Sequence, residues 1–328
     1  MSRPLWITEA EIVELMNLGE AIGALEAGLR LEAEGRAQNM AKTHAVWGGG
    51  HTLHAIGAVA PGAETVGTKT WAHTAGGATP LLILWDSESG ALRAVLEAFA
   101  LGQMRTGAMT GVATKWMAAP EADAMAIVGT GKQAITQVAA VHAVRPLARL
   151  RVHSPRAESR AAFIDEVRTR FDFEIEDCAD VASATRDMPI VTLVTRAKQA
   201  FLGSAELAAG AHLNAVGAIT PEREEFRQDV FGRVGAVAVD SVDSVKRLSR
   251  EFIEHYESGS GDWPAVRPIS ALIAEDYRRT PETDLTLFKA MGMGISDLAL
   301  GVELLARAER AGLGRPIDPP KKVTPRLT

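Results

Sequence analysis

The spacing of hydrophobic and polar positions changes several times along the first third of the chain. Thr8 and Glu11 are spaced as a capping box ahead of an apolar-periodic run, which predicts a helix start, and a second helix is expected over residues 18–35. The pattern then changes to short β-like runs with a hairpin turn at residues 86–90, which predict four strands: Thr52–Val59, Thr65–Trp71, Leu81–Trp85 and Leu92–Leu96. Because residues 104–117 return to a helical pattern, this part is expected to combine a β-sheet with helices.

After Pro120 the chain alternates strands and helices. The helical stretches are residues 135–144 and 157–170, and the apolar runs of strand length predict five strands: Ala124–Val128, Leu150–His153, Pro189–Val194, His212–Val216 and Gly235–Asp240. This alternation implies right-handed crossovers and a parallel sheet, so we predict an α/β fold class. From about residue 285 the pattern is helical again, and we expect this helix to return to the first module. The Pro- and Lys-rich tail over residues 316–328 is expected to lack structure.

Composition narrows the class of protein. Among 328 residues, 47% are hydrophobic and 23% are charged, as is typical of a globular protein, and the formal net charge of −6 comes without any run of like charge. We therefore expect neither nucleic acid nor a membrane as a partner. No stretch reaches the roughly 20 apolar residues that span a bilayer, and the N-terminus turns acidic before any signal-length apolar run appears. The single cysteine, Cys178, cannot form an internal disulfide, which fits a reducing compartment, so we expect a cytoplasmic protein.

A glycine-rich loop carries the strongest chemical signal. Gly129-Thr130-Gly131-Lys132-Gln133-Ala134 matches the G-x-G-x-x-A pattern, follows an apolar strand and opens a helix. Gly129 permits the tight turn, Gly131 lets the backbone approach a pyrophosphate, and Ala134 lets the helix pack closely on the strand. The helix N-terminus offers free N–H groups to the phosphates. We therefore predict a Rossmann fold that binds a dinucleotide; the alternative is a glycine-rich turn without a ligand.

The end of the second strand of this module indicates which dinucleotide is bound. Enzymes that bind NAD commonly place an acid there, about 20 residues after the glycine loop, to accept from the ribose 2′-hydroxyl. Here Ser154 takes that place and Arg156 follows, a pair that can hydrogen-bond and neutralise a 2′-phosphate. We therefore predict NADPH/NADP as the cofactor. The alternative is that Arg156 and Arg160 are solvated residues at a helix start and that NADH is used as well.

Two cations precede the glycine loop. Lys69 shares a strand face with Gly67 and Trp71, and desolvation there would lower its pKa and make the amine a usable proton donor or acceptor; the alternative is a solvated surface lysine. Arg105 lies in a helix rich in small residues and can grip a carboxylate with two hydrogen bonds, while Thr106 reaches a phosphate. The alternative for Arg105 is a salt bridge at a domain boundary. The eight histidines, with no Cys or carboxylate cluster beside them, do not predict a metal site.

Five motifs occur in an order and spacing that resemble one protein family: Thr68-Lys69-Thr70, Arg105-Thr-Gly-Ala, Ile127-Val-Gly129-Thr-Gly131-Lys-Gln-Ala134, Asn214-Ala-Val-Gly217 and Leu287-Phe-Lys289-Ala-Met-Gly292-Met-Gly-Ile-Ser-Asp297. Together they are similar to the ornithine cyclodeaminase/mu-crystallin family over nearly the whole chain. The resemblance implies a Rossmann domain over residues 120–297 and an N-terminal α+β substrate-binding and dimerisation domain over residues 1–119, completed by a C-terminal helix within about 298–328. It also implies a homodimer built through the N-terminal domain, with the substrate between the two domains.

The resemblance also assigns roles to residues by position. It implies that Lys69 lies beside the reacting nitrogen and carboxylate of the substrate and that Arg105 binds the carboxylate. Lys42 stands where the family usually has another arginine, a substitution that keeps the charge and loses the two-pronged fork. His44 and His73 lie close in sequence and are candidates for a second polar group of the substrate. The residues expected at the cofactor are Thr106, Gly129, Thr130, Gly131, Lys132, Gln133, Ser154, Arg156, Thr195, Val216, Gly217, Lys289 and Gly292.

One departure from the family pattern bears on the reaction. Ornithine cyclodeaminase has an acidic residue just after the Asn-Ala-Val-Gly strand, where it serves the substrate amine, and Ile219 occupies that place here. An isoleucine accepts no proton and pairs with no ammonium, which favours a reductase that takes an already formed imine. Glu222 or Glu224 would compensate if the loop were shifted in register.

We therefore expect an NAD(P)H-dependent oxidoreductase that reduces a small imino acid to an L-amino acid. The imino acid is of the ketimine, Δ1-pyrroline-2-carboxylate, Δ1-piperideine-2-carboxylate or iminosuccinate type. Three alternatives are an ornithine cyclodeaminase-type ammonia lyase that recycles bound NAD, an alanine dehydrogenase-like enzyme, and a non-catalytic NADPH-dependent binding protein of the mu-crystallin type. The presence of both Lys69 and Arg105 argues for chemistry, since a pure binder does not need both.

Overall fold

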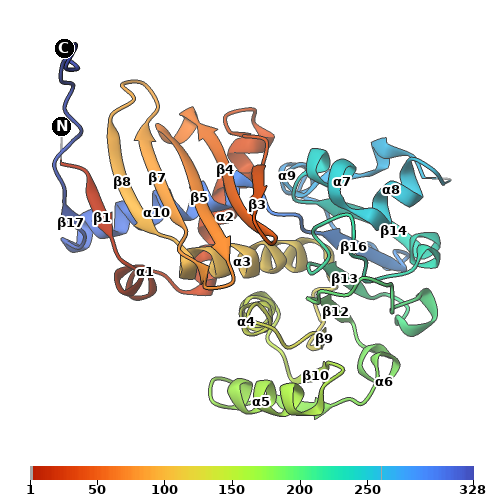
Figure 1. Ribbon diagram of the computed structural model, residues 1–328. Coiled ribbons are helices and arrows are strands. Elements are labelled where there is room, and N and C mark those ends of the chain that lie inside the picture. Colours follow the sequence, from red (N-terminus) through yellow and green to blue (C-terminus); the bar gives the residue numbers. More distant parts are fainter. Residues whose placement is uncertain (1–2, 260) are drawn as a thin grey trace.

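Two β-sheets, each flanked by helices, make up the computed structural model, which describes residues 3–259 and 261–328 (Figure 1). The strands of the first sheet are β1 Leu5–Ile7, β2 Gln38–Asn39, β3 Thr43–Trp47, β4 His51–Ala60, β5 Thr65–Thr74, β6 Gly77–Ala78, β7 Leu81–Asp86, β8 Leu92–Glu97 and β17 Arg315–Pro316. They run in the order β17-β1-β8-β7-β5-β4-β2, with β3 paired to β4 and β6 to β5. The long central strand β5 runs antiparallel to both of its neighbours, β4 and β7. Successive side chains of these strands alternate between the two faces of the sheet.

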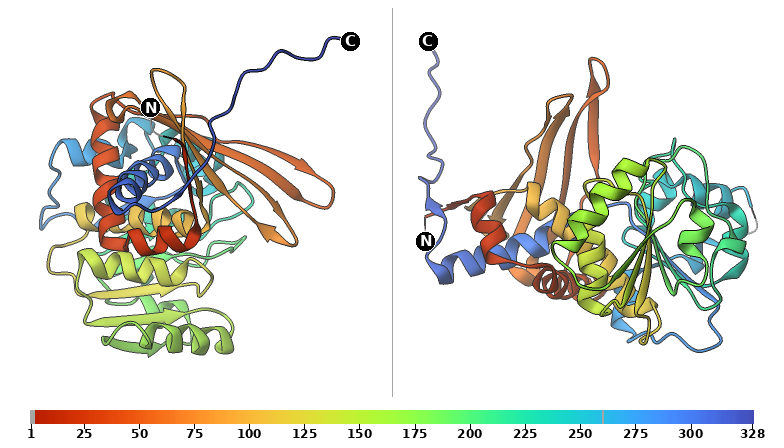
Figure 2. Two further views of the ribbon diagram at one scale, coloured as in Figure 1. Left: turned by 90° about the vertical axis from the view of Figure 1, so that its left-hand side faces the viewer. Right: turned by 90° about the horizontal axis from the view of Figure 1, so that it is seen from below.

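Helices gather on one face of the first sheet (Figure 2). The helices of this half are α1 Glu9–Leu15, α2 Leu18–Ala33, α3 Phe99–Met117, α10 Gly294–Ala311 and the 3₁₀ helix η1 Pro61–Ala63. Helix α10 comes back from the far end of the chain and packs against β4, β5 and β7. Small residues permit the contact, because a Cβ at Gly301 would lie 2.4 Å from a methyl group of Leu82. The expected return of a C-terminal helix to the first module is confirmed.

The second sheet is parallel throughout and doubly wound. Its strands are β9 Ala124–Val128, β10 Arg149–His153, β11 Glu174–Asp177, β12 Ile190–Leu193, β13 His212–Ala215, β14 Val234–Val239, β15 Arg267–Pro268 and β16 Leu285–Lys289. The order is β11-β10-β9-β12-β13-β16-β14-β15, so the chain moves outward from β9 in one direction and then returns to β12 to continue in the other. The flanking helices are α4 Ala134–Val144, α5 Ala157–Arg168, α6 Val181–Thr185, α7 Val242–Leu248, α8 Arg250–Tyr256 and α9 Ile269–Ala274, with 3₁₀ turns η2 Ser204–Glu206, η3 Gln228–Arg233 and η4 Trp263–Ala265. This confirms the predicted α/β fold with a Rossmann-type sheet.

Most predicted strands and helices are confirmed, and the main difference lies near the C-terminus. The capping box at Thr8 is present, since Glu11 exchanges hydrogen bonds with it. The prediction that the chain turns helical from about residue 285 is wrong, because β16 lies there, inside the second sheet, and α10 begins only at Gly294. All five residues of β16 are buried, so the strand shows no alternation of apolar and exposed polar positions. The domain boundaries at residues 119 and 297 stay a prediction.

A buried polar network joins α3 to the second sheet. Asn214 Nδ2 donates to Thr114 Oγ1 at 3.1 Å, and Asn214 Oδ1 lies 3.1 Å from Nε2 of His212. The other ring nitrogen of His212 lies 2.8 Å from Thr286 Oγ1. Burial lowers the pKa of His212 to about 3, so the ring stays neutral inside the protein. The network holds α3, which carries Arg105, against β13 and β16.

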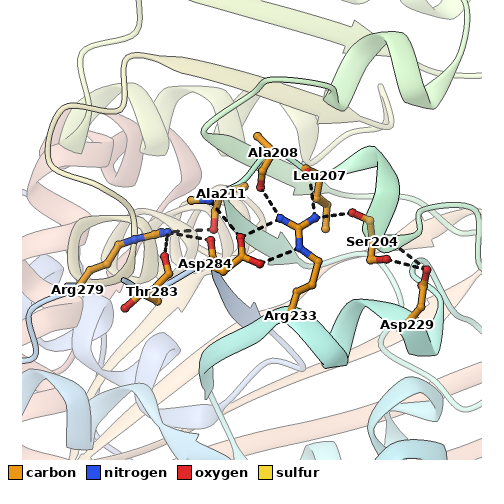
Figure 3. A network of polar contacts seen from close by, with 10 residues as sticks. Ser204, Leu207, Ala208, Ala211, Asp229, Arg233, Arg279, Thr283 and Asp284 are labelled. Carbon is orange, nitrogen blue, oxygen red and sulfur yellow. Dashed lines mark hydrogen bonds and ion pairs between the residues drawn. The ribbon is translucent and has the colours of Figure 1, made fainter. Parts of the chain in front are cut away.

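A second polar network lies at the amino ends of these strands (Figure 3). Arg233 contacts both carboxylate oxygens of Asp284 at 2.9 Å and donates to backbone carbonyl groups of residues 204–208. Arg279 donates to the carbonyl groups of Thr283 and Asp284. Because Asp284 directly precedes β16 and Arg233 directly precedes β14, this network holds the amino ends of these two strands. Parallel α/β sheets bind their ligands at the opposite side, beyond the carboxyl ends of the strands.

Candidate functional site

The two sheets meet where the chain passes from β16 to α10. A Cβ at Gly294 would lie 1.8 Å from the carbonyl oxygen of Gly57 on β4, so this crossing requires glycine. The N–H of Ile295 donates to Asn39 Oδ1 at 2.9 Å. The carboxyl end of β16 is thereby brought next to the middle of β4 and β5, where charged side chains cluster.

Lys69 and Asp297 form a buried ion pair at this junction. Lys69 lies in β5 opposite Ile56 of β4 and Leu82 of β7, on the face that α10 covers. Its Nζ donates to Asp297 Oδ1 at 2.5 Å, and the two side chains are 5% and 1% exposed. Asp297 ends the motif that spans residues 287–297, but it was not among the predicted site residues. Its partner lies 228 positions earlier in the chain, and only the fold brings the two together.

Arg105 approaches the same carboxylate from α3. Its Nε lies 3.4 Å from Asp297 Oδ1. Its guanidinium lies against Gly292, where a Cβ would be 3.2 Å from Nη1, and Gly292 also has a φ of +88°. One turn earlier on α3, a Cβ at Gly102 would be 3.6 Å from Lys69 Nζ. Two cations therefore converge on one buried carboxylate.

Asp240, just after β14, fixes the turn that holds Gly292. It is 2% exposed and accepts hydrogen bonds from the N–H of Met291 at 2.9 Å and from the N–H of Gly292 at 2.6 Å. Burial raises the pKa of Asp240, while the two N–H donors and the charge of Arg105 oppose the shift. The backbone beside Arg105 is thus held by a side chain from the neighbouring strand.

The environment of Lys69 sets its proton affinity. Burial is the largest effect and lowers the pKa of Lys69 to about 8. The carboxylate of Asp297 opposes this by stabilising the ammonium form, whereas the charges of Arg105 and Lys42 add to the lowering. Near neutral pH the amine therefore carries a proton that it gives up more readily than an ordinary lysine does. A general acid needs this property.

Lys42 joins the same cluster from the segment between β2 and β3. Burial lowers its pKa, the charge of Arg105 lowers it further, and Asp240 and Asp297 raise it. The charges of Lys42, Lys69 and Arg105 thus act on one another, and the roles that the family resemblance implies for them at the substrate stay a prediction.

A row of aromatic rings extends from Lys69 along the same face of the first sheet. Lys69 Nζ is 5.3 Å from the ring centroid of Trp71, which stacks on His54 at 4.7 Å, and His54 stacks on His44 at 5.7 Å. Burial lowers the pKa of His54, and neighbouring cationic groups, His73 among them, add to the lowering. His44 and His73 are exposed. The sequence did not point to His54, because only the strand register places it opposite both Trp71 and His44.

The glycine-rich loop between β9 and α4 has the shape of a phosphate cradle. Gly129 has a φ of +111°, and a Cβ there would lie 2.6 Å from the carbonyl oxygen of Val194. At Gly131, apart from its two chain neighbours, no atom of the described residues lies within 4 Å of where a Cβ would be, so the backbone faces open space. Among the described residues no side chain caps the N-terminus of α4. The N–H of Ala134, its first residue, donates to the carbonyl of Gly131 at 2.8 Å. Thr130 and Lys132 border this space, which fits the pyrophosphate of a dinucleotide.

Ser154 and Arg156 lie just beyond β10, at the end of the cradle where a ribose would lie. Ser154 is 9% exposed, and its carbonyl accepts from Arg160 Nη1 at 2.7 Å. Arg160 also pairs with Asp177 at the end of β11, an acid that sequence reasoning did not consider. Arg156 is exposed and forms no ion pair within residues 3–259 and 261–328. Of the two arginines, Arg156 is therefore the one available to a phosphate.

Thr195 and Gly217 lie in the loops that follow β12 and β13, and these loops touch. A Cβ at Gly217 would lie 2.2 Å from the backbone nitrogen of Thr195. Val216 is buried just before this contact. Thr195 in turn lies against the glycine-rich loop, since its Cγ2 would be 3.2 Å from a Cβ at Gly129. The structure thus brings the predicted residues of three strand ends together.

Lys289 is a correction to the predicted cofactor set. Its side chain has no exposed surface, and its Nζ lies 3.5 Å from Oε2 of Glu251, which is fully buried as well. The enclosed side chain therefore presents no surface to a cofactor in this structure. Gln133 belongs to the glycine-rich loop itself, and Thr106 lies in α3. The hydroxyl proton of Thr106 is already used, because the hydroxyl donates to the Gly102 carbonyl at 2.9 Å.

Ile219 packs against the core of the second sheet, as an apolar residue does. Glu222 is exposed, and Glu224 pairs with Arg250 of α8 at 3.5 Å. Glu224 is thus engaged with α8, and compensation for Ile219 by either glutamate stays a prediction. The carboxylate that Lys69 contacts is that of Asp297.

Over residues 3–259 and 261–328, no three His, Cys, Asp or Glu side chains are grouped so that they could hold a metal ion. Over the same residues, none of the helices combines the length and the apolar character that crossing a bilayer requires.

Comparison with known sequences places this arrangement among characterised proteins. A sequence model of the ornithine cyclodeaminase/mu-crystallin family matches residues 3–309. The Δ1-pyrroline-2-carboxylate reductase of Bacillus cereus is 28% identical over 262 residues, which cover 79% of this chain and 78% of that enzyme.

Two solved structures share the fold over almost the whole chain. The Δ1-pyrroline-2-carboxylate reductase of Thermococcus litoralis, in complex with NADH and L-proline, gives a TM-score of 0.89 at 23% identity, covering 95% of this chain and 100% of that one. An archaeal alanine dehydrogenase dimer with bound NAD gives 0.88 at 23% identity, covering 96% and 99%. At these identities the likeness shows that the fold is the same.

Proposed function

This chain belongs to the ornithine cyclodeaminase/mu-crystallin family, and we propose that it is an NAD(P)H-dependent oxidoreductase that reduces a small imino acid to an L-amino acid. The observation that carries the proposal is the buried group of Lys69, Asp297 and Arg105 at the carboxyl edge of a dinucleotide-binding sheet. The Bacillus cereus relative, a Δ1-pyrroline-2-carboxylate reductase, supports the same reaction class.

Arg105 and Lys42 account for binding of the substrate carboxylate. Arg105 presents a guanidinium whose parallel N–H groups match a carboxylate, and Gly292 leaves space in front of it. Lys42 adds a second charge to the same region. The carboxylates of Asp297 and Asp240 neutralise only part of the positive charge of this cluster. The negative charge of a substrate carboxylate would neutralise the remainder.

Lys69 accounts for the proton. Reduction of a C=N bond to an amine takes one hydride at carbon and one proton at nitrogen; a reduced nicotinamide, when bound, supplies the hydride. The ammonium of Lys69 donates its proton to the imine nitrogen, and the neutral amine that remains is hydrogen-bonded to Asp297. Asp297 orients the amine and keeps it protonated before the reaction. Burial of the pair excludes water, which strengthens both effects.

The alternatives fit the site less well. An ammonia lyase acting on ornithine needs a group for the second amine at the position of Ile219, which is apolar here. A pure binding protein has no use for a buried lysine with a lowered pKa, and burying such an ion pair carries a desolvation cost. An alanine dehydrogenase-like enzyme differs from the proposal only in forming the imine from ammonia and a keto acid.

A substrate panel tests the proposal. Oxidation of NADPH and of NADH is followed with cyclic imino acids, linear ketimines and an iminodicarboxylate, and ornithine is assayed in parallel for released ammonia. We expect cofactor oxidation with at least one imino acid and no ammonia from ornithine. Ammonia released from ornithine without net cofactor oxidation would assign the protein to the lyases, and pyruvate reduced only when ammonia is present would favour the amino acid dehydrogenase.

We propose further that the cofactor is NADPH in preference to NADH, with its 2′-phosphate at Ser154 and Arg156. Arg156→Ala is then expected to raise KM for NADPH by about 10-fold or more, because a hydrogen bond to a charged group is lost, and to leave KM for NADH nearly unchanged. Arg168→Ala, which removes an exposed arginine from the far end of the same helix, serves as the control. A wild-type protein with a clear preference for NADH contradicts this assignment.

The uncovered face of the first sheet supports a homodimer, with residues 1–119 and about 298–328 as the dimerisation domain. Side chains at alternate positions of β3, β4, β5 and β7 point away from α10, and many of them are apolar: Trp47, Leu53, Val59, Val66, Leu81, Ile83 and Trp85. Trp47, Leu53 and Val59 are 44%, 50% and 42% exposed. A sheet face of this composition is normally covered in the assembled protein.

Charge placed on this face is expected to separate the protomers. We expect Leu53→Lys combined with Ile83→Lys to give a monomer by light scattering, while the wild-type chain has twice the monomer mass. Val13→Lys, at an exposed apolar residue of α1 (64% exposed), serves as the matched control and should stay dimeric. A monomeric wild-type protein at micromolar concentration would contradict the proposed interface.

A further inference from the structure

A fully buried glutamate, Glu225, lies behind the loops that follow β12 and β13, and the proposed reaction does not use it. Its own backbone is fixed on both sides. The carbonyl of Glu225 accepts from the N–H groups of Phe201 and Leu202 at 3.2 Å, and its N–H donates to Oε1 of Glu251 at 3.0 Å. The side chain is 0% exposed.

The carboxylate of Glu225 joins the two loops directly. Oε1 accepts from the N–H of Thr195 at 2.7 Å and from its hydroxyl at 2.8 Å. Oε2 accepts from the N–H of Gly217 at 2.8 Å and from that of Ala218 at 3.0 Å. One oxygen therefore serves the loop after β12, and the other serves the loop after β13.

Two further charged residues, Glu251 and Lys289, lie behind Glu225. Glu251 Oε2 accepts from the Ser249 hydroxyl at 2.9 Å and lies 3.5 Å from Nζ of Lys289, and all three residues are buried. Burial raises the pKa of Glu225, while Lys289 and the loop donors oppose the shift. A buried charge cluster of this kind is costly, so its presence calls for a role that packing alone does not supply.

The position of the two loops suggests that role. The strand order changes direction between β9 and β12, and ligands of doubly wound sheets lie across this point at the carboxyl ends of the strands. With the ribose end at β10 and the pyrophosphate at the loop after β9, the rest of a dinucleotide extends over β12 and β13. Thr195 lies against Gly129, so a shift of the loop that carries Thr195 would also displace the glycine-rich loop.

We propose that Glu225 is a positioning residue that locks the loops after β12 and β13 into one rigid floor for the nicotinamide half of the cofactor. The inference rests on the proposed dinucleotide binding. It adds that the affinity for the nicotinamide half depends on a carboxylate that touches neither cofactor nor substrate. Its two oxygens accept all four of these hydrogen bonds from the two loops, which a carboxylate can do because it is an acceptor only.

The test compares a whole cofactor with a fragment that lacks nicotinamide. Dissociation constants of NADPH and of 2′-phospho-ADP-ribose are measured by titration calorimetry for the wild type, for Glu225→Gln and for the control Glu222→Gln, an exposed glutamate of the same loop. In Glu225→Gln the amide NH₂ replaces one acceptor oxygen and faces at least one backbone N–H donor, so we expect a dissociation constant for NADPH raised about 10-fold or more. We expect the fragment to bind within about 3-fold of the wild type, and Glu222→Gln to bind both as the wild type does.

The outcomes separate the inference from the proposed function. Equal weakening of NADPH and fragment, or no weakening of either, overturns the role of Glu225. A wild-type protein that binds neither overturns dinucleotide binding itself, and the inference falls with it.

Hydrogen exchange of the wild type keeps the inference testable if Glu225→Gln does not fold. NADPH, but not the fragment, is expected to slow amide exchange at Thr195 and at Gly217–Ala218, while both ligands slow it at Gly129–Ala134. Slowing by the fragment equal to that by NADPH at all three places overturns the inference.

Discussion

Lys69→Met is expected to lower kcat/KM for the imino acid by about 10²- to 10⁴-fold while the affinity for the nicotinamide cofactor changes little. The range is that of a positioned general acid. Methionine keeps the hydrocarbon stem of the buried side chain and removes the ammonium that contacts Asp297 at 2.5 Å. Arg105 Nε, 3.4 Å from the same oxygen, still compensates the negative charge of Asp297, so we expect the variant to fold.

Steady-state kinetics and cofactor titration on one preparation measure both halves of this prediction. Lys69→Ala is expected to behave in the same way. Lys115→Met is a matched control, because Lys115 also pairs with a carboxylate, that of Glu26 at 2.6 Å, but lies near the far end of α3. Near-normal turnover in Lys69→Met, with the control also unaffected, would remove Lys69 from the reaction.

Asp297→Asn is expected to lower kcat/KM by about 10²-fold or more and to move its pH dependence. In the wild type, Lys69 is protonated below a pKa of about 8, so imine reduction should fall as the pH rises through that value. Asp297 raises this pKa by stabilising the ammonium. Without its charge the ammonium is lost at lower pH, and the falling limb should move toward acid.

The pH profile of kcat/KM separates this role from a structural one. A change that merely loosened the fold would reduce activity without displacing the falling limb in this direction. Asp318→Asn, which removes an exposed carboxylate paired with Arg3, serves as the control. A falling limb that stays in place, or moves toward alkali, would show that Asp297 does not tune Lys69.

Local patterns account for what could be predicted from the sequence. The glycine-rich loop is a contiguous motif between an apolar strand and a helix, and the structure places it between β9 and α4. Lys69 was expected to share a face with Trp71 because strand alternation is local, and its Nζ does lie over that ring at 5.3 Å.

Contacts between distant segments account for what could not be predicted. Asp297 reaches Lys69 only because α10 folds back over the first sheet. His54 acquires its neighbours from strand register. Lys289 looked available in a segment expected to be helical, whereas it belongs to an inner strand and is fully buried. In each case the missing information was which segment lies alongside which.

Transfer of a labelled hydride tests the central claim most directly. The protein is incubated with NADPH that carries deuterium at both C4 positions of the nicotinamide and with the imino acid that the substrate panel identifies, and the product is analysed by mass spectrometry. The account predicts one deuterium on the α-carbon of the amino acid for each NADP formed. An unlabelled amino acid, or product formed without net oxidation of NADPH, would contradict it.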